Sequence, residues 1–286
     1  MKNIASGSAI TNSRPPHAGG GGVRGFSLVE MALVLLIVGL LAAVFLPATN
    51  TFLDNNRRKE TRAKLEALEQ AMVRFVMVNR RLPCPADGSL APGNANQGLE
   101  LVLAGVCNPV TQINGVVPWR SLGLAQSDAT DAWRSLITYR VWPQLTSSNG
   151  MDMPWDPATQ NAQIQGFLQA RGFRVCSGAC VAAPDAELAT RTNMTGAAYV
   201  LISHGANRVR GFNTEGTYIA AANGAGPGPL EDINRNQLDV RTTGTSDFYI
   251  DTELSENPAA YYDDIVLRPT VMSVAMAAGL GPRKAP

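Results

Sequence analysis

A short acidic stretch in the last third of the chain has the side chains that a calcium site needs. Asp232, Asn234, Asn236 and Asp239 place side-chain oxygens at roughly alternate positions, and Ca²⁺ binds about six to eight oxygen ligands. The spacing resembles the start of a helix–loop–helix calcium loop, but Gln237 stands where that loop needs glycine, and no glutamate follows at the twelfth position. The alternative is a turn in which these side chains accept hydrogen bonds from backbone amides.

Residues that could perform catalysis are few. His17 and His204 are the only histidines. Ser203 precedes His204 directly, and neighbours on a strand face opposite sides, so the two do not form a catalytic triad. We find no glycine-rich phosphate loop, dinucleotide fingerprint or GxSxG motif. The net charge of +1 also gives no sign of nucleic-acid binding. We therefore expect a chain that is not an enzyme and has no nucleic-acid partner.

The longest apolar stretch is residues 26–46, in which only one of 21 residues is charged. As a helix it would be about 31 Å long, close to the thickness of a bilayer core, so we predict a transmembrane segment. The exception is Glu30. A carboxylate in a membrane costs about 2.5–3.5 kcal/mol at mid-helix and usually has a partner. The apolar run itself offers none.

The helix is expected to continue beyond the apolar run. Pro47 should kink it without ending it, and Pro83 should stop it. Between these prolines, apolar residues recur at spacings of three and four, which predicts one buried helical face: Leu65, Leu68, Met72, Phe75 and Val76. One helix from about Phe26 to Asn79 follows, with its second half packed on a globular head.

The junction Gly25–Phe26, followed by Glu30, resembles the processing site of type IV prepilins and of type II secretion pseudopilins. In that family a prepilin peptidase cuts after the glycine and methylates the new first residue, glutamate stands fifth after the cut, and many members have a proline where Pro47 stands. The resemblance implies a leader, 1–25, that is removed, a transmembrane and assembly helix, 26–46, its periplasmic continuation, 47–80, and a head, 81–286.

Cleavage would give Glu30 a partner. The new amine at Phe26 lies four residues away, so the two could pair within one helix. Alternatively, Glu30 of one subunit could meet the Phe26 amine of the next, and would then set the register between subunits rather than add stability. The other interpretation is a simple signal anchor whose Glu30 reaches back to the headgroups.

The resemblance also implies a pilin-like α+β fold, in which the long N-terminal helix, transmembrane in its first half, packs on a small antiparallel sheet. Asp131-Ala132-Trp133 is similar to a turn that precedes a strand in major pseudopilins. We expect strands, each with turn residues around it, at 136–141, 172–176, 197–203, 217–221, 248–250 and 264–267. Residues 143–171 are expected to be a loop, and the tail from Thr270 to fray.

Two further expectations concern the head. The segment from Ser203 to Asn207, together with Asp263 and Asp264, is similar to the calcium site of major pseudopilins, which implies calcium held by Asn207, Asp263 and Asp264. The four cysteines are an even number, which in a periplasmic setting suggests disulfides. Pairing neighbours closes loops of about 24 and 5 residues: Cys84 with Cys107, and Cys176 with Cys180.

Together these features predict a structural subunit of a type II secretion pseudopilus in the inner membrane, with its leader cytoplasmic and its head periplasmic. Its partners would be the prepilin peptidase, other pilin-like subunits, the assembly platform and the membrane. A minor type IV pilin for adhesion, motility or DNA uptake is an alternative. An alternative of another class is a signal-anchored periplasmic enzyme or ligand-binding protein.

Overall fold

The computed structural model describes residue 25 and residues 27–108, 114–154, 158–178, 187–220, 228–235 and 248–282, without the side chains of 44–50. The chain divides into two compact units, Met1–Asn50 and Thr51–Pro286. Helix α1, Leu28–Asn79, begins in the first unit and ends in the second. We describe each unit by itself.

The described part of the first unit is the beginning of α1. A reciprocal pair of hydrogen bonds starts this helix: the Glu30 amide donates to Ser27 Oγ at 3.2 Å, and the Ser27 amide donates to Glu30 Oε2 at 2.9 Å. This is a capping box, which satisfies two amides that the first turn leaves unpaired. From Leu28 to Ala43 every side chain is exposed, and Glu30 is the only charged one.

The predicted transmembrane span is contradicted. Among the residues that the structure describes, no helix has an apolar stretch long enough to cross a membrane. This finding overturns the expected transmembrane first half of the fold, and with it the single-pass inner-membrane location with a cytoplasmic leader and a periplasmic head.

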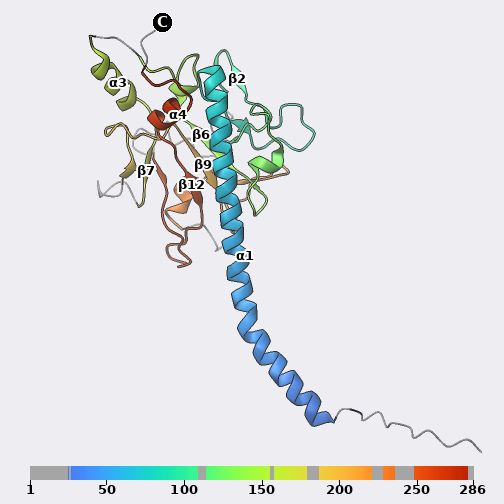
Figure 1. The fold of residues 1–286 in the computed structure, drawn as a ribbon. Coiled ribbons are helices and arrows are strands. Elements are labelled where there is room, and N and C mark those ends of the chain that lie inside the picture. Colours follow the sequence, from blue (N-terminus) through green and yellow to red (C-terminus); the bar gives the residue numbers. More distant parts are fainter. Residues whose placement is uncertain are drawn as a thin grey trace, which may run out of the picture. The chain divides into compact units, whose positions relative to one another are not determined.

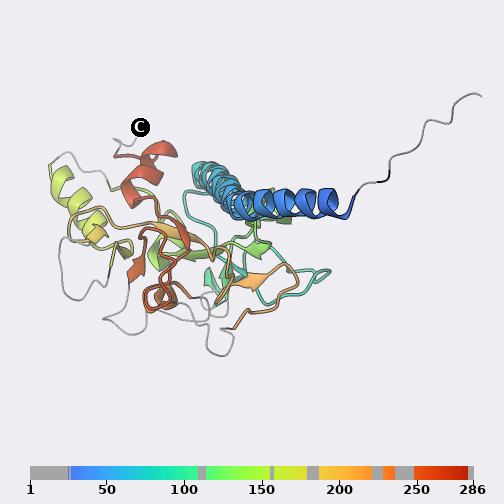
Figure 2. The same cartoon turned by 90° about the horizontal axis from the view of Figure 1, so that it is seen from below.

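In the second unit, the remainder of α1 buries one face. Leu65, Leu68, Met72 and Val76 are at most 1% exposed and belong to the largest core cluster, which also contains Tyr139 of the sheet. Their spacing of three and four puts them on one side of the helix. Figure 1 shows this part of α1 running alongside β6, β9 and β12, and Figure 2 gives the same view from below. The helix ends at Asn79, and Arg80 has a positive φ of 56°.

The largest sheet is antiparallel and has five strands in the order β1-β4-β6-β9-β12. Its strands are β1 (Ala86–Asp87), β4 (Gly115–Val116), β6 (Thr138–Val141), β9 (Tyr199–Ser203) and β12 (Ile265–Leu267). Ile202 of β9 lies between Thr138 of β6 and Val266 of β12. The five strands follow one another in chain order, but long segments separate them in the sequence, so residues about 64 positions apart become neighbours.

Three smaller sheets complete the strands that the structure describes. They pair β10 with β5, place β7 between β11 and β8, and join β2 to β3. The strands of these sheets are β10 (Phe212–Asn213), β5 (Ser135–Leu136), β7 (Arg174–Cys176), β11 (Phe248–Ile250), β8 (Glu187–Ala189), β2 (Val102–Leu103) and β3 (Val106–Cys107). Strands β11 and β7 are parallel. The prediction of one small antiparallel sheet is therefore wrong: the head distributes twelve described strands over four sheets, one of them mixed.

Other expectations about the head also need correction. The segment expected to be a loop contains a 3₁₀ turn, η2 (Pro143–Thr146), and helix α3 (Gln160–Gln169). The tail does not fray at Thr270 but forms helix α4, Val271–Ala277, which buries apolar side chains in the core. Residues 217–220 form no strand, although Tyr218 makes an isolated bridge to Phe212. Two further 3₁₀ turns are η1 (Gln126–Ala129) and η4 (Glu231–Asn234).

The cysteine pairing predicted between Cys84 and Cys107 is confirmed, with their Cα atoms 5.2 Å apart. Cys176 is also disulfide-bonded. Cys180 lies outside the described residues.

Candidate metal centre

Three carboxylates gather at one place in the head. Glu231 comes from η4, and Asp263 and Asp264 directly precede β12. One oxygen from each lies within 4.8 Å of the others, and the three residues are 1%, 1% and 5% exposed. Oxygens that bind one Ca²⁺ at 2.3–2.6 Å lie no more than about 5 Å apart. The three side chains are therefore close enough to share one ion.

The loop after β9 holds Asp263 in place. Asp263 Oδ2 accepts hydrogen bonds from the Ala206 amide at 2.7 Å, the Asn207 amide at 3.0 Å and the Tyr261 hydroxyl at 2.8 Å. Gly205 has a φ of 55°, and a Cβ there would lie 2.6 Å from Asp263 Oδ1, so the loop can come this close only with glycine. The structure thus brings together the two segments that the sequence paired, 203–207 and 263–264.

Asp264 is fixed from its other side. Its Oδ2 accepts a hydrogen bond from Asn234 Nδ2 at 2.9 Å, and its Oδ1 lies 3.6 Å from His204 Nδ1. His204 Nε2 lies 2.9 Å from Thr138 Oγ1. Carboxylate, imidazole and hydroxyl follow one another as in sites that activate a nucleophile, but His204 and Thr138 are 0% exposed. A substrate could not reach the Thr138 hydroxyl, so we assign the histidine a role in positioning Asp264.

The electrostatics of the cluster favour either protons or a cation. Burial, followed by the neighbouring Asp263 and Asp264 carboxylates, raises the pKa of Glu231 to about 10. Burial also raises the pKa of Asp264, while His204 and Asn234 act in the opposite direction. Oδ1 of Asp263 and Oδ1 of Asp264 are buried and have no hydrogen-bond partner. Carboxylate oxygens suit hard cations such as Ca²⁺, so Glu231, Asp263 and Asp264 fit a calcium ion, which would compete with protons on Glu231 and Asp264.

The predicted ligand Asn207 lies beside the cluster, with its side-chain oxygen engaged elsewhere. Its Oδ1 accepts the Val209 amide at 2.8 Å, which identifies the oxygen end of the side chain. The Nδ2 end therefore faces the cluster and donates to Glu231 Oε1 at 2.9 Å and to Oε2 at 3.1 Å. The third carboxylate of the cluster is Glu231, which the sequence analysis did not predict as a ligand of this site. It was missed because no spacing relates it to Asp263, which lies 32 positions further along the chain.

The second candidate calcium loop divides its side chains between other interactions. Asp232 forms ion pairs with Arg210, at 3.0 Å, and with Arg235. Asn234 is fully buried and holds β11, because its Oδ1 accepts the Ile250 amide at 2.8 Å and its Nδ2 donates to the Ile250 carbonyl at 2.8 Å. Asn236 and Asp239 lie outside the described residues. The described half of this motif thus acts as a structural turn.

Of the residues predicted for processing and assembly, Gly25 is exposed, with no atom within 4 Å of the position of a Cβ. Phe26 lies outside the described residues. Pro47 is within α1, but its side chain is outside the described part. Glu30 is exposed and forms the capping box with Ser27.

No family model, curated protein or solved structure matches this chain. A function must therefore be argued from the motif at residues 25–30 and from the surfaces and contacts of the structure.

Proposed function

We propose that this chain is a pilin-like structural subunit of a type II secretion pseudopilus. In this proposal a prepilin peptidase cuts the precursor after Gly25, and copies then assemble through the first part of α1. The head contributes contacts between subunits and no catalysis. The partners are the peptidase, other pilin-like subunits and the assembly platform. The observation that supports the proposal best is the apolar surface of α1 from Leu28 to Ala43, which its own unit leaves uncovered.

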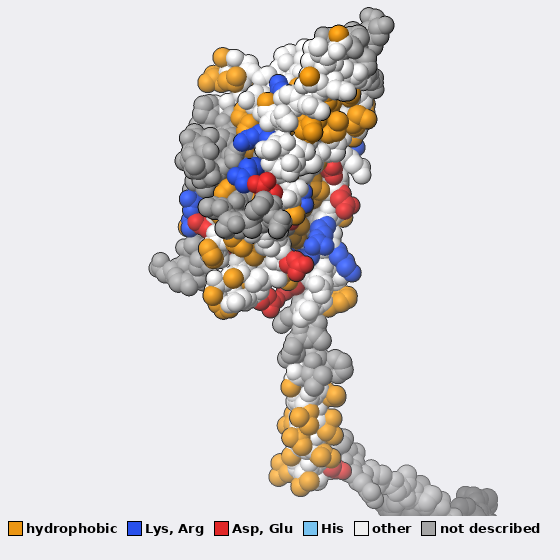
Figure 3. Space-filling view, turned by 90° about the vertical axis from the view of Figure 1, so that its left-hand side faces the viewer, with side chains coloured by type: hydrophobic (Ala, Val, Ile, Leu, Met, Phe, Trp, Pro, Cys, Tyr) orange, Lys and Arg blue, Asp and Glu red, His pale blue; other side chains and the backbone are white. Residues whose placement is uncertain are grey.

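The exposed fractions on this helix are high. Leu28 is 91% exposed, Leu35 65%, Leu36 61% and Leu40 62%. Figure 3 shows hydrophobic side chains covering the visible face of this segment. Fully burying one such side chain contributes about 1.5–3 kcal/mol, and large exposed apolar patches on proteins mark sites of interaction. Packing several copies of this part of α1 together would cover this surface.

Glu30 gives the assembly a means of setting register. It is the only charged side chain between Leu28 and Ala43. Once the helices pack together, an unpartnered carboxylate would be costly, whereas the amine that cleavage creates on a neighbouring copy would neutralise it. The capping box gives Glu30 a second, local role that needs no charge, because glutamine also serves at this position of the motif. The two roles can therefore be separated by mutation.

The first experiment determines the N-terminus of the mature protein by mass spectrometry, in cells with and without a prepilin peptidase. We expect a chain that begins at N-methylated Phe26 only when the peptidase is present. A chain that keeps residues 1–25 in both strains would refute the proposal.

The second experiment compares Glu30→Gln, Glu30→Ala and the control Glu66→Ala, which removes an exposed glutamate from the same helix. Glu30→Gln keeps the hydrogen-bonding capacity of the cap but removes the charge. We expect both Glu30 variants to be processed but not incorporated into filaments, and Glu66→Ala to be incorporated normally. Normal incorporation of Glu30→Gln would show that the residue acts only as a cap.

A further inference from the structure

A hollow of about 550 Å³ lies beside the part of α1 that belongs to the second unit, and we call it the basic hollow. Small-molecule sites in proteins have volumes of about 300–1,000 Å³. The α1 wall of the hollow is a single helical face, because its residues stand three, four and seven positions from the first one: Asn55, Arg58, Lys59 and Arg62. The hollow is therefore large enough for a small ligand, and α1 lines it with three cationic side chains.

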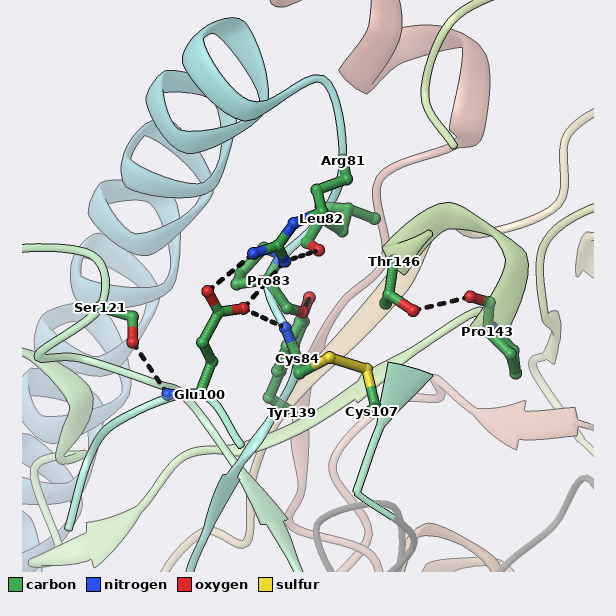
Figure 4. Close-up of a disulfide and its surroundings, with 10 residues drawn as sticks. All are labelled: Arg81, Leu82, Pro83, Cys84, Glu100, Cys107, Ser121, Tyr139, Pro143 and Thr146. Atoms are coloured by element: carbon green, nitrogen blue, oxygen red, sulfur yellow. Dashed lines mark hydrogen bonds and ion pairs between the residues drawn. A yellow bond between two sulfur atoms is a disulfide. The ribbon is translucent and has the colours of Figure 1, made fainter. Parts of the chain in front are cut away.

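The cations of this wall lack the carboxylate partner that several other cations of the head have. Figure 4 shows one such pair, in which the Arg81 guanidinium donates two hydrogen bonds to Glu100, at 2.8 and 2.9 Å. Within the described part of the chain, Arg58, Lys59 and Arg62 form no ion pair. A guanidinium can give two parallel hydrogen bonds to a carboxylate or a phosphate. These side chains are therefore available to an anionic ligand.

The other wall of the basic hollow contains carboxylates, but most of them are engaged elsewhere. Asp251 is neutralised by Arg268, whose Nε lies 2.8 Å from Asp251 Oδ2. Asp264 is 5% exposed and accepts the hydrogen bond from Asn234 described above. Glu253 is exposed, and it has no cationic partner among the described residues. The cations of the lining therefore outnumber the carboxylates that are free to pair with them.

We propose that the basic hollow binds a small molecule that carries a phosphate monoester group. Such a group has about −1.5 to −2 charge at pH 7 and three acceptor oxygens, so it suits a wall with three cationic donors. Arg58 and Arg62, one helical turn apart, would bind these oxygens, and the Thr252 hydroxyl can donate a further hydrogen bond. Leu188 and Leu254, which are 38% and 50% exposed, would pack against the organic part of the ligand.

The basic hollow lies entirely within the second unit, so the site requires neither cleavage after Gly25 nor assembly through the first part of α1. A chain that forms no filaments would refute the proposed function and leave this site standing, and a chain that binds no phosphate ester would do the reverse. The phosphate group can belong to a soluble ester or to a lipid headgroup. Both sources present the same chemistry to the cations of α1.

Isothermal titration calorimetry of the full chain with phenyl phosphate at pH 8 tests the site. We expect a Kd below about 1 mM that rises with NaCl concentration, because salt screens exposed charges. Arg58→Gln/Arg62→Gln should weaken binding about tenfold or more. The matched control, Arg57→Gln/Arg74→Gln, removes the same charge from exposed positions of the same helix outside the hollow. This control should change Kd by less than about twofold.

Vesicles distinguish the two sources of the phosphate group. The full chain is sedimented with phosphatidylcholine vesicles that contain or lack phosphatidic acid, so that the vesicles differ in their phosphate monoester groups. Extra binding to phosphatidic acid that Arg58→Gln/Arg62→Gln abolishes would identify a lipid headgroup as the ligand. Equal binding to both vesicles, together with binding of phenyl phosphate in the titration, would identify a soluble ester.

A further variant strengthens the site instead of weakening it. Glu253→Gln removes the exposed carboxylate from the wall opposite α1 and should lower the Kd for phenyl phosphate about twofold or more, a gain that a poorly folded chain would not give. No binding of phenyl phosphate by the unaltered chain would overturn the proposal. Equal weakening by Arg58→Gln/Arg62→Gln and by its matched control would overturn it too, since the anion would then respond only to the net charge of the helix.

Discussion

Removing the Cys84–Cys107 disulfide is the perturbation whose size can be worked out most directly. The bond joins residues 23 positions apart and closes a loop of about 24 residues. The chain-entropy model then gives a stabilisation of about 3.5 kcal/mol at 25 °C. Since 1 kcal/mol corresponds to about 2–4 °C in a chain of 150–250 residues, replacing both cysteines by alanine should lower Tm by about 7–14 °C. The two sulfurs are nearly fully buried, and lost packing will add to this effect.

The assay is differential scanning calorimetry of the unaltered chain, of the double variant Cys84→Ala/Cys107→Ala, and of Val106→Ala as a control. Val106 is a neighbour of Cys107 and is 57% exposed, so its truncation should change stability by less than about 0.5 kcal/mol. A Tm loss below about 3 °C in the double variant would refute the reasoning. It would mean that the ion pair between Arg81 and Glu100 already restrains the loop without the disulfide.

Two further predictions concern the carboxylate cluster and α4. The raised pKa values of Glu231 and Asp264 mean that the native state holds protons that the unfolded state releases, so without metal stability should fall as pH rises from about 4.5 toward 10. Calcium must displace these protons, so it should bind more weakly at low pH. Relative to EGTA, CaCl₂ at about 100 times its Kd at pH 8 should raise Tm by about 5–11 °C at pH 8, and the same concentration should raise it by less at pH 5. An equal rise in Tm at both pH values would contradict a calcium site at this cluster. The Thr270 hydroxyl accepts a hydrogen bond from the Ser273 amide at the start of α4. Thr270→Ala removes this hydroxyl and should lower Tm by about 2–4 °C, whereas Thr270→Ser keeps a hydroxyl and should leave Tm unchanged. Thermal denaturation followed by circular dichroism measures both values.

The sequence indicated local features of the head better than its connections. The buried positions Leu65, Leu68, Met72 and Val76 follow from periodicity alone, because they depend only on which residues share a helical face. The pairing of β12 with β9 cannot be read in this way, since it joins residues about 64 positions apart. Helix α4 was missed because a tail of small residues gives a weak helical signal, and its stability comes from burial of Val271 and Val274 in the core.

The candidate metal centre shows the same limit at the level of single side chains. The sequence indicated that the segments 203–207 and 263–264 meet, and the structure places them together. The role of Asn207 depends on which end of its amide faces inward, and the Val209 amide decides this through a tertiary hydrogen bond. Glu231 enters the cluster from a separate 3₁₀ turn. Residue spacing predicts neither the orientation of the Asn207 amide nor the presence of Glu231 in the cluster.

The position of β12 in the sheet has a consequence for biosynthesis. The strand lies at the edge of the five-stranded sheet, and its Leu267 packs against the same core as the buried face of α1, which ends at Val76. Ribosomes add about 5–20 residues per second, so about 10–40 s pass between synthesis of that face and synthesis of β12. During this time the core that covers the second half of α1 lacks β12, so leucines along that half of the helix are exposed, as those of the first half are. A chaperone that binds exposed apolar segments would therefore act in this interval, before β12 has been made.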